Sequence, residues 1–393
     1  MVLRLRWNSM DAEKKLAIIV SINDKYNYPI RTKYSTKVLN DAGYDVIVIS
    51  SDFDHRKKKH YKDNREGLIQ LPTRPYTKNL SISRIISLID FSHKALKKAE
   101  ELKPKLIYVS GPPNDQYKCF AKYKKHHPEA IIGAEVGDMW PESLPISGKL
   151  KKMALLPLKI WSSLRDDYLG QFDFIITECK LFETMLSETV IPDKLQTIYF
   201  CKDDNTTLIR DAKMDFNVVN LAYLGSVNNI IDIQLIAKMV GEIHQYKPVR
   251  FHLIGSGENK EELCELIKAK GAEICDYGEV YDLDRKSKIL SQCMFAFNVM
   301  KTSVCVGMTM KSLDYFQFGI PILNNINGDI WKMTKDKNVG FNFNQNTSGD
   351  IAKRVANINY EIWNEMQINT RNVFDDNFSL KAFQSKFSNV IEK

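Results

Sequence analysis

The chain has 393 residues and a mass of 45.3 kDa, with 44% hydrophobic and 26% charged residues. These values are typical of a globular protein of two or three domains and exclude a largely disordered or fibrous chain. No run of about 18 uncharged apolar residues occurs, and the first 15 residues lack the apolar core of a signal peptide. The seven cysteines form no CxxC pair, which favours reduced thiols in a cytoplasmic protein over a disulfide or zinc framework.

The positive charge is confined to the first half of the chain. Residues 1–200 contain 33 Lys and Arg against 24 Asp and Glu, a net charge of +9, whereas residues 201–393 contain 23 and 24, a net charge of −1. This asymmetry is compatible with a solvated surface, or with an anionic partner such as a membrane face, a lipid pyrophosphate or nucleic acid. The basic runs at 56–59 and 122–125 lack the interleaved aromatic residues of RNA-recognition motifs, so we do not expect nucleic acid.

Apolar runs rich in β-branched residues alternate with amphipathic stretches from the beginning of the chain. This order predicts a parallel sheet with helices on both faces. The predicted strands are 16–22, 45–50, 106–109, 130–136 and 174–177, and the predicted helices are 33–42 and 83–102.

A second alternating set follows the polar stretch 201–216, which is the best candidate for a linker. Its predicted strands are 218–224, 250–254, 273–277, 294–299 and 320–323, and its predicted helices are 231–245, 260–269, 284–292 and 311–318. We therefore predict an α/β protein with two doubly wound, Rossmann-like domains at 1–200 and 217–376. A C-terminal helix is expected at 377–393.

Glycine-rich turns follow two strands of the second set, where ligands bind in doubly wound sheets. Gly225-Ser226 and Gly255-Ser256-Gly257 leave backbone amides unobstructed, which suits a phosphate or a sugar hydroxyl. A glycine after a strand is also an ordinary turn residue. Because the GSG run lacks a full GxGxxG, a dinucleotide site is not supported.

The segment from Gly307 to Pro321 carries a more specific signal. Thr309 is a plausible N-cap, and Lys311 then falls in the first helical turn, where a cation opposes the helix dipole. Such a lysine makes sense if it faces a diphosphate. Asp314 shares its helix face and could accept hydrogen bonds from a ribose diol, or simply form an i,i+3 salt bridge with Lys311.

Two features of the first half also point to a ligand or a surface. Asp138 and Trp140 follow a predicted strand and together suit a sugar ring, unless Pro141 starts a helix with Trp140 packed beneath it. The stretch 148–161 mixes lysines with large apolar residues. It could be an interfacial membrane helix or an ordinary amphipathic one, and Pro157 interrupts it.

The order of these elements and their motifs resemble the nucleotide-sugar-dependent glycosyltransferases of the GT-B fold, specifically glycosyltransferase family 4. Lys311, Asp314-Tyr315 and Gly319-Ile-Pro321 resemble the donor-site motif of that family, and 137–142 (GDMWPE) is similar to its acceptor-domain segment. The turns at 223–225 and 253–257 and the strand end at 277–280 are similar to its glycine turns and base-contacting strand. The resemblance implies two domains that face each other across a cleft, with a chain end that often crosses back to the first domain.

The resemblance also assigns roles. Lys311 would neutralise the donor diphosphate, Asp314 would bind the ribose, and Asp138 would face the acceptor or the transferred sugar, so Lys311 and Asp138 are the expected catalytic residues. Gly278 and Val280 would hold the base through backbone groups. The other expected donor-binding residues are Gly225, Ser226, Gly255, Ser256, Gly257, Gly307, Met308 and Thr309.

The family retains anomeric configuration, and its departing diphosphate is thought to accept the proton of the acceptor. It uses no metal, and this sequence has no HxH or DxD cluster, so we expect no metal or cofactor. Two departures stand out. Val306 replaces the first acidic residue of the family's paired motif, and 226–232 lacks the Arg and Lys that usually grip the phosphates.

The leading hypothesis is a cytoplasmic, membrane-peripheral hexosyltransferase. It would transfer a sugar from a nucleotide sugar, with a UDP-sugar favoured, to a cell-surface glycan such as a capsule polysaccharide or to an acceptor on a lipid pyrophosphate. The two departures motivate a second hypothesis, a non-catalytic GT-B subunit that binds a glycan or a partner glycosyltransferase. A sugar-nucleotide epimerase with the same fold is a third.

Overall fold

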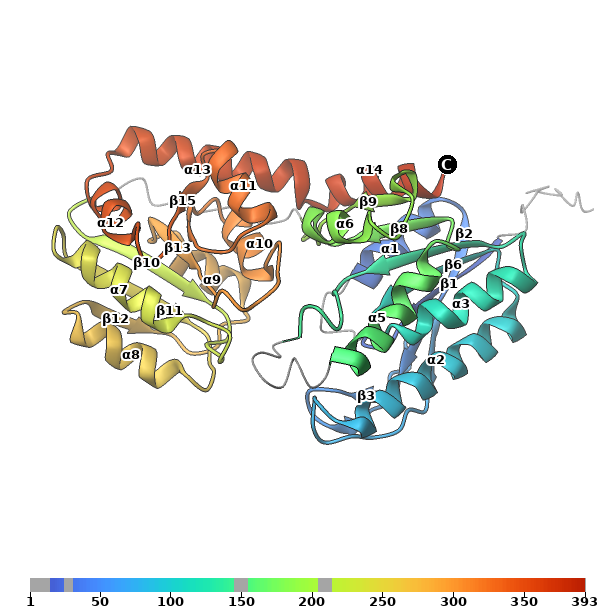
Figure 1. Ribbon diagram of the computed structural model, residues 1–393. Helices are drawn as coiled ribbons and strands as arrows, with labels where there is room; N and C mark the ends of the chain where they lie inside the picture. Colours follow the sequence, from blue (N-terminus) through green and yellow to red (C-terminus); the bar gives the residue numbers. More distant parts are fainter. Residues whose placement is uncertain (1–14, 25–30, 145–154, 204–213, 393) are drawn as a thin grey trace, which may run out of the picture.

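The structure is a computed structural model, which describes residues 15–24, 31–144, 155–203 and 214–392. It consists of two α/β domains side by side, each with a parallel sheet between layers of helices (Figure 1). The predicted fold class is confirmed. No helix among the described residues is both long enough and apolar enough to cross a bilayer.

The first domain contains a seven-stranded parallel sheet in the order β5-β2-β1-β6-β7-β8-β9. The interior strand β1 is buried along almost its whole length, as expected for a strand covered on both faces. The strands are β1 Lys15–Ser21, β2 Tyr44–Ser51, β5 Leu68–Leu71, β6 Leu106–Gly111, β7 Ile131–Val136, β8 Phe174–Thr177 and β9 Leu195–Thr197, and β3 Phe53–Asp54 pairs with β4 Lys59–His60 in a separate ribbon. The helices are α1 Arg31–Asp41, α2 Ile82–Leu102, α3 Asp115–His126, α5 Leu155–Leu169 and α6 Lys180–Leu186, with a 3-10 turn at Pro192–Lys194.

The second domain contains a six-stranded parallel sheet in the order β12-β11-β10-β13-β14-β15. The order reverses direction at β10, so the ends of β10 and β13 form the switch point at which ligands bind in such sheets. The strands are β10 Val219–Leu224, β11 Val249–Ile254, β12 Glu273–Asp276, β13 Phe295–Asn298, β14 Ile322–Asn324 and β15 Gly340–Asn342. The helices are α7 Ile233–His244, α8 Lys260–Ala269, α9 Leu283–Leu290, α10 Met310–Gln317, α11 Asp329–Asp336, α12 Ser348–Ala356 and α13 Tyr360–Asn377.

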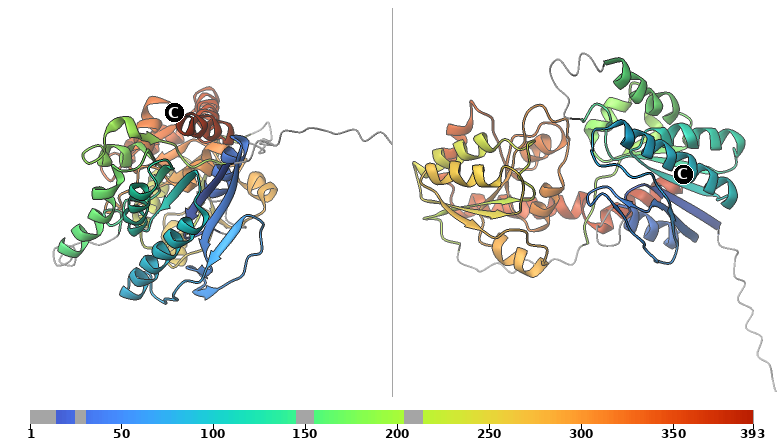
Figure 2. Two further views of the ribbon diagram at one scale, coloured as in Figure 1. Left: turned by 90° about the vertical axis from the view of Figure 1, so that its right-hand side faces the viewer. Right: turned by 90° about the horizontal axis from the view of Figure 1, so that it is seen from below.

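The end of the chain crosses from the second domain to the first. Helix α13 is followed by α14 Leu380–Ile391, which packs on the first domain (Figure 2). The ring of Phe383 lies 6.2 Å from that of Tyr34 in α1, and the ring of Phe387 lies 5.1 Å from that of Tyr108 in β6. A second crossing runs alongside, because Lys202 donates its backbone amide to the carbonyl of Phe378.

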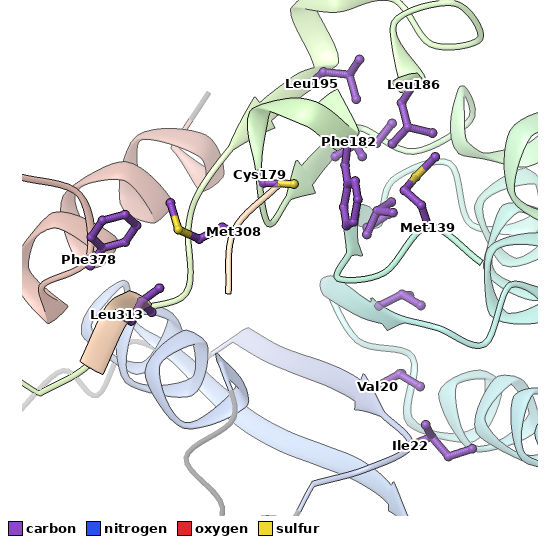
Figure 3. Packing of buried hydrophobic residues seen from close by; sticks show 14 of the residues in the cluster. Val20, Ile22, Met139, Cys179, Phe182, Leu186, Leu195, Met308, Leu313 and Phe378 are labelled. Carbon is purple, nitrogen blue, oxygen red and sulfur yellow. The ribbon is translucent and has the colours of Figure 1, made fainter. Parts of the chain in front are cut away.

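Apolar side chains from both domains form one continuous cluster where the domains meet. Cys179 and Phe182 of the first domain and Met308, Leu313 and Phe378 of the second belong to it (Figure 3). Because this cluster excludes water, polar groups at its edge interact strongly with one another.

All predicted strands occur within two residues of their expected ends, and the predicted helices lie where expected. The predictions missed β3, β4, β5, β9, β15, α3, α6, α11, α12 and most of α13. Strands β9 and β15 were missed because they are only three residues long. Helix α3 was missed because the basic run at 122–125 obscures the periodicity of its buried residues. The predicted linker 201–216 and the stretch 148–161 lie partly outside the described residues.

Candidate functional site

The glycine turns of the second domain are sites of close backbone approach. Gly225, Gly255 and Gly257 all have positive φ, at 114°, 150° and 139°. A Cβ on Gly255 would lie 2.0 Å from the carbonyl oxygen of Gly225, and one on Gly257 would lie 2.6 Å from the amide of Val227. Only glycine fits at these two positions, so the two turns are packed against each other.

The other turn residues predicted to bind the donor border the same edge. The amide of Gly255 donates to the carbonyl of Gly278 over 2.7 Å, which joins the third turn to the second. Ser256 donates its hydroxyl to Glu279 over 2.7 Å, and Val280 is buried. The structure thus gathers the predicted residues of three strand ends at one edge of the sheet.

Lys311 lies at the same edge, on the first turn of α10. Its Nζ donates to the hydroxyl of Tyr223 over 3.0 Å and stands 4.4 Å from the centre of that ring. The hydroxyl of Tyr223 in turn donates to the carbonyl of Ser226 over 3.0 Å. Within the described residues, Lys311 makes no salt bridge.

Burial lowers the pKa of Lys311 to about 7, because the charged ammonium is removed from water and no carboxylate compensates for it. A cation in this state is stabilised by any anion that enters its surroundings. Tyr223, which the sequence analysis named only as part of a motif, holds the lysine in place. Its signal was its position two residues before Gly225.

The N-terminus of α10 is organised by a capping box. The hydroxyl of Thr309 accepts the amide of Ser312 over 3.2 Å, as predicted for an N-cap, and donates to Asn298 over 2.7 Å. Met308 is buried. A Cβ on Gly307 would lie 2.8 Å from Asp329 and from Cys179, which places Gly307 at the domain interface.

Asp314 is paired with two lysines rather than with Lys311. Its carboxylate contacts Lys202, which follows β9, and Lys286 of α9, the latter at 3.9 Å. The predicted i,i+3 salt bridge with Lys311 does not form. The binding of ribose by Asp314 stays a prediction, and Lys202 and Lys286 add positive charge beside a site whose 226–232 turn supplies none.

Val306 lines a cavity of about 200 Å³ at the junction of the two domains. Its other walls include Met300, Cys305 and Asn325 of the second domain and Leu181 of the first. The residue that departs from the family motif therefore borders a space open to both domains.

Asp138 lies in a cavity of about 240 Å³ in the first domain, together with Trp140 and Arg84. Burial raises the pKa of Asp138, although the hydroxyl of Ser143 donates to its carboxylate. Residues 140–143 form a turn, and the chain beyond 144 lies outside the described residues, so the role of this segment stays a prediction. Trp140 packs edge-on against Trp161, with ring centres 5.8 Å apart.

The loop that carries Asp138 is held by a buried arginine. Arg165 of α5 binds both carboxylate oxygens of Glu142 at 2.9 Å and donates to the carbonyl of Trp140 over 2.8 Å. Asn114 donates to the same carbonyl over 2.8 Å. This bidentate clamp fixes the position of the loop. No local sequence pattern predicts it, because Arg165 is distant from Glu142 along the chain.

Glu178 is a further acidic residue near Asp138 that the sequence analysis missed. It follows β8, and its pKa is raised well above the usual range by burial and by the charge of Asp138. Asp138 and Glu178 follow neighbouring strands, β7 and β8. Two carboxyl groups with raised pKa values at one edge of a sheet are typical of a functional site. The available signal was a glutamate directly after a buried strand.

Asp329 connects the two domains beside this edge. Its carboxylate accepts the amides of Lys180 and Leu181 over 2.6 and 2.9 Å, and the hydroxyl of Tyr199 over 2.6 Å. An aspartate at the start of α11 thereby caps the N-terminus of α6 in the other domain.

Among the described residues, one group of possible metal ligands occurs, formed by His93 of α2 with Asp115 and Cys119 of α3, whose ligand atoms lie within 4.8 Å of one another. None of the three lines a cavity described above. The expectation that the site needs no metal stays a prediction.

No family model and no curated protein matches the sequence. Solved structures do match the fold. HepE of Anabaena in complex with UDP superposes with a TM-score of 0.69 at 12% identity, over 96% of this chain and 99% of that one. Sucrose-phosphate synthase of Thermosynechococcus elongatus has a TM-score of 0.70 at 10% identity, over 96% and 98%. The lipopolysaccharide outer core galactosyltransferase WaaB, in its apo form, has a TM-score of 0.65 at 13% identity, over 96% and 99%.

These likenesses extend over nearly the whole chain. The matching structures include glycosyltransferases, and HepE was solved with UDP and with UDP-glucose. At such low identity the comparison concerns architecture. The chain has the GT-B fold, with two Rossmann-like domains joined by a crossing C-terminal helix.

Proposed function

We propose that the protein is a glycosyltransferase that uses a nucleotide sugar, with a UDP-sugar favoured, as donor. The observation that carries the proposal is Lys311, a half-buried cation that makes no salt bridge with any described residue, at the switch-point edge of the second sheet. Burying a lysine without a counter-ion is costly, so the position calls for an anionic ligand. The diphosphate of a nucleotide-sugar donor would supply that charge.

In this proposal the transferred sugar lies between Lys311 and the cavity of the first domain that contains Asp138. The acceptor oxygen bonds to the anomeric carbon as the bond from that carbon to the diphosphate breaks. The acceptor proton passes to a departing phosphate oxygen, with retention of configuration. Lys311 stabilises the negative charge that develops on the diphosphate, which is the main demand of such a reaction.

The acceptor is proposed to be a cell-surface glycan, with or without a lipid carrier. The net charge of +9 in residues 1–200 supports an anionic acceptor or membrane surface next to the first domain. Peripheral association with the inner face of the membrane follows from the same charge.

Val306 keeps a second candidate open, a GT-B subunit that binds donor or glycan without catalysis. The cavity bordered by Val306 lacks the carboxylate expected to contact the transferred sugar. A transfer assay separates the candidates, because the subunit would bind nucleotide and release no product. Incubation of the donor without acceptor reveals an epimerase, which interconverts the free sugar nucleotide.

The direct test of the donor site is a thermal-shift panel of UDP, GDP, ADP and CMP. A nucleotide at 100 times its Kd adds about 2.7 kcal/mol to the free energy of unfolding, which raises Tm by about 5–10 °C. We expect UDP to stabilise the native protein and Lys335→Ala, an exposed lysine of α11, but not Lys311→Ala. A protein that no nucleotide stabilises would refute the proposal.

A further inference from the structure

Two hollows of the first domain share a wall. The cavity that contains Asp138 is lined largely by polar groups, including those of Asn23, Ser51 and Thr73. Next to it is a groove of about 270 Å³, whose walls are mainly apolar. Arg84, Leu88 and Trp140 line both spaces. The polar cavity, called the chamber below, and the apolar groove are therefore neighbours that share these three side chains.

The groove is lined by the first residues of α2 and by Trp161 of α5. Both helices begin on the side of the first domain that faces the second domain (Figure 1). Leu80, Ile82 and Ile85 form one wall and are 61%, 76% and 39% exposed. Trp161 of α5 forms the other wall. Three residues that precede Trp161 in α5 are also exposed, although they do not line the groove: Leu155, Leu156 and Ile160.

Exposed aliphatic side chains scattered singly need no explanation, but a group of three that lines one groove does. Such a group on a protein surface marks a site for an apolar ligand, a membrane or a partner. The polar chamber beside it restricts the choice, because the ligand must be polar at one end and apolar at the other.

Two cations lie near the junction of the chamber and the groove, because Arg84 lines both spaces and Lys58 contacts Tyr76, which lines the chamber. Arg84 stands 4.8 Å from the ring centre of Trp140 and 5.8 Å from that of Tyr76, and Lys58 stands 4.5 Å from the ring centre of Tyr76. Neither forms a salt bridge with any described residue, and the Nε of Arg84 is buried without a hydrogen-bond partner. The pKa of Lys58 is lowered by burial and by the charge of Arg84.

An anionic group at the junction would pair with both cations and remove their mutual repulsion. The junction therefore specifies a negative charge between the polar and the apolar parts of the ligand. A carbohydrate attached through phosphate to a hydrocarbon chain has this order of parts, whereas a neutral glycan or an uncharged lipid lacks one of them.

We propose that the chamber and the groove together bind the acceptor, and that the acceptor is a lipid-linked phosphate. Its phosphate lies between Arg84 and Lys58, its hydrocarbon chain follows the groove between α2 and α5, and its sugar extends into the chamber beside Asp138. This inference rests on the proposed function and names the acceptor of the same site.

The test is a titration with farnesyl phosphate below its micelle-forming concentration, followed by the fluorescence of Trp140 and Trp161. Farnesol and inorganic phosphate serve as the tail-only and head-only probes. We expect farnesyl phosphate to bind at least tenfold more tightly than either. Equal binding of farnesyl phosphate and farnesol would contradict the role of the cations, and equal binding of farnesyl phosphate and inorganic phosphate would contradict that of the groove.

Variants locate the binding. Ile85→Glu introduces a charge into the groove and Arg84→Gln removes one cation, and each should weaken farnesyl phosphate at least tenfold. Ile368→Glu on α13 is the matched control, because Ile368 is 53% exposed and distant from the groove in the chain fold. Equal effects of Ile85→Glu and Ile368→Glu would overturn the inference.

The thermal shift with UDP is measured on the same variants and separates the two proposals. A shift with UDP that persists while farnesyl phosphate binds no better than phosphate overturns the lipid-linked acceptor and leaves the donor site intact. Loss of any nucleotide shift in the native protein contradicts the proposed function instead.

Discussion

The two domains place their positive charge in different ways. The second domain, with a net charge near zero, holds the half-buried Lys311 against Tyr223 at an edge formed by glycine turns. The first domain carries the excess of cations and keeps Lys58 and Arg84 at the mouth of an apolar groove. A buried cation suits a small ligand that is enclosed, and cations beside exposed apolar side chains suit a ligand that stays partly at a surface.

Removal of Lys311 should have the largest effect. We expect Lys311→Met to reduce transfer more than 100-fold, because the leaving diphosphate loses its main counter-charge. The free protein should become more stable, by on the order of 1–3 kcal/mol at pH 7, because an unpaired buried charge is removed. Initial rates and thermal unfolding of the ligand-free variant measure both effects. A variant less stable than the native protein would contradict the uncompensated burial of Lys311.

The second prediction concerns the contact between the domains. Asp329→Ala leaves two amides and the hydroxyl of Tyr199 without their acceptor. Each lost partner of a buried donor costs about 1–3 kcal/mol, although water will reach some of these groups. We expect Tm to fall by several degrees and transfer to fall more than UDP binding, because the domains are held less firmly. Unchanged unfolding would show that the three hydrogen bonds contribute nothing to domain association.

The third prediction is the pH dependence of UDP binding. The folded, ligand-free pKa of Lys311 is about 7, below its unfolded value of 10.5, so the unfolded state binds more protons between these values. The stability of the free protein should therefore rise with pH across this window. UDP binds best when Lys311 is protonated, so UDP binding above pH 7 is coupled to the uptake of a proton by Lys311. The affinity of the protein for UDP should therefore fall by up to tenfold per pH unit above about pH 7.

Lys311→Arg is the control for this effect, because arginine stays protonated throughout the range. Calorimetric titration of UDP from pH 7 to pH 9 should show a steep loss of affinity for the native protein and a nearly flat profile for the arginine variant. Parallel profiles for the two proteins would assign the pH dependence to another group.

The smallest expected effect is at Asp314, where the family resemblance and the observed ion pairs differ. If the carboxylate binds ribose, Asp314→Asn should weaken UDP about fivefold, the value of one hydrogen bond, and reduce the preference for UDP over 2′-deoxy-UDP. If pairing with Lys202 and Lys286 is its only role, the variant should bind UDP as tightly as the native protein or more tightly. We predict the first result.

The comparison of the domains also explains which parts of the site were accessible from the sequence. The edge of the second sheet where we propose that the donor binds depends on local patterns. These are glycine turns directly after strands and the spacing from Thr309 to Lys311 to Asp314, so its residues could be named from the sequence. Tyr223 belongs to the same local pattern, but its hydrogen bond to Lys311 required the fold.

The acceptor side depends on contacts between distant segments. Arg165 clamps Glu142 across 23 positions, and Arg84 meets Trp140 across 56. No local spacing encodes these contacts. The fold class was predictable because most strands of both sheets are apolar runs of four or more residues. Strands β9 and β15, with three residues each, are too short to show such a run.

The central claim is that Lys311 is a half-buried, uncompensated cation that receives the donor diphosphate. The most direct measurement is an NMR titration of the Lys311 side chain, with and without UDP, in protein carrying labelled lysine and assigned through Lys311→Arg. The account predicts a pKa of about 7 in the free protein and a rise of more than one unit when UDP binds. A pKa near 10.5 that UDP leaves unchanged would contradict it.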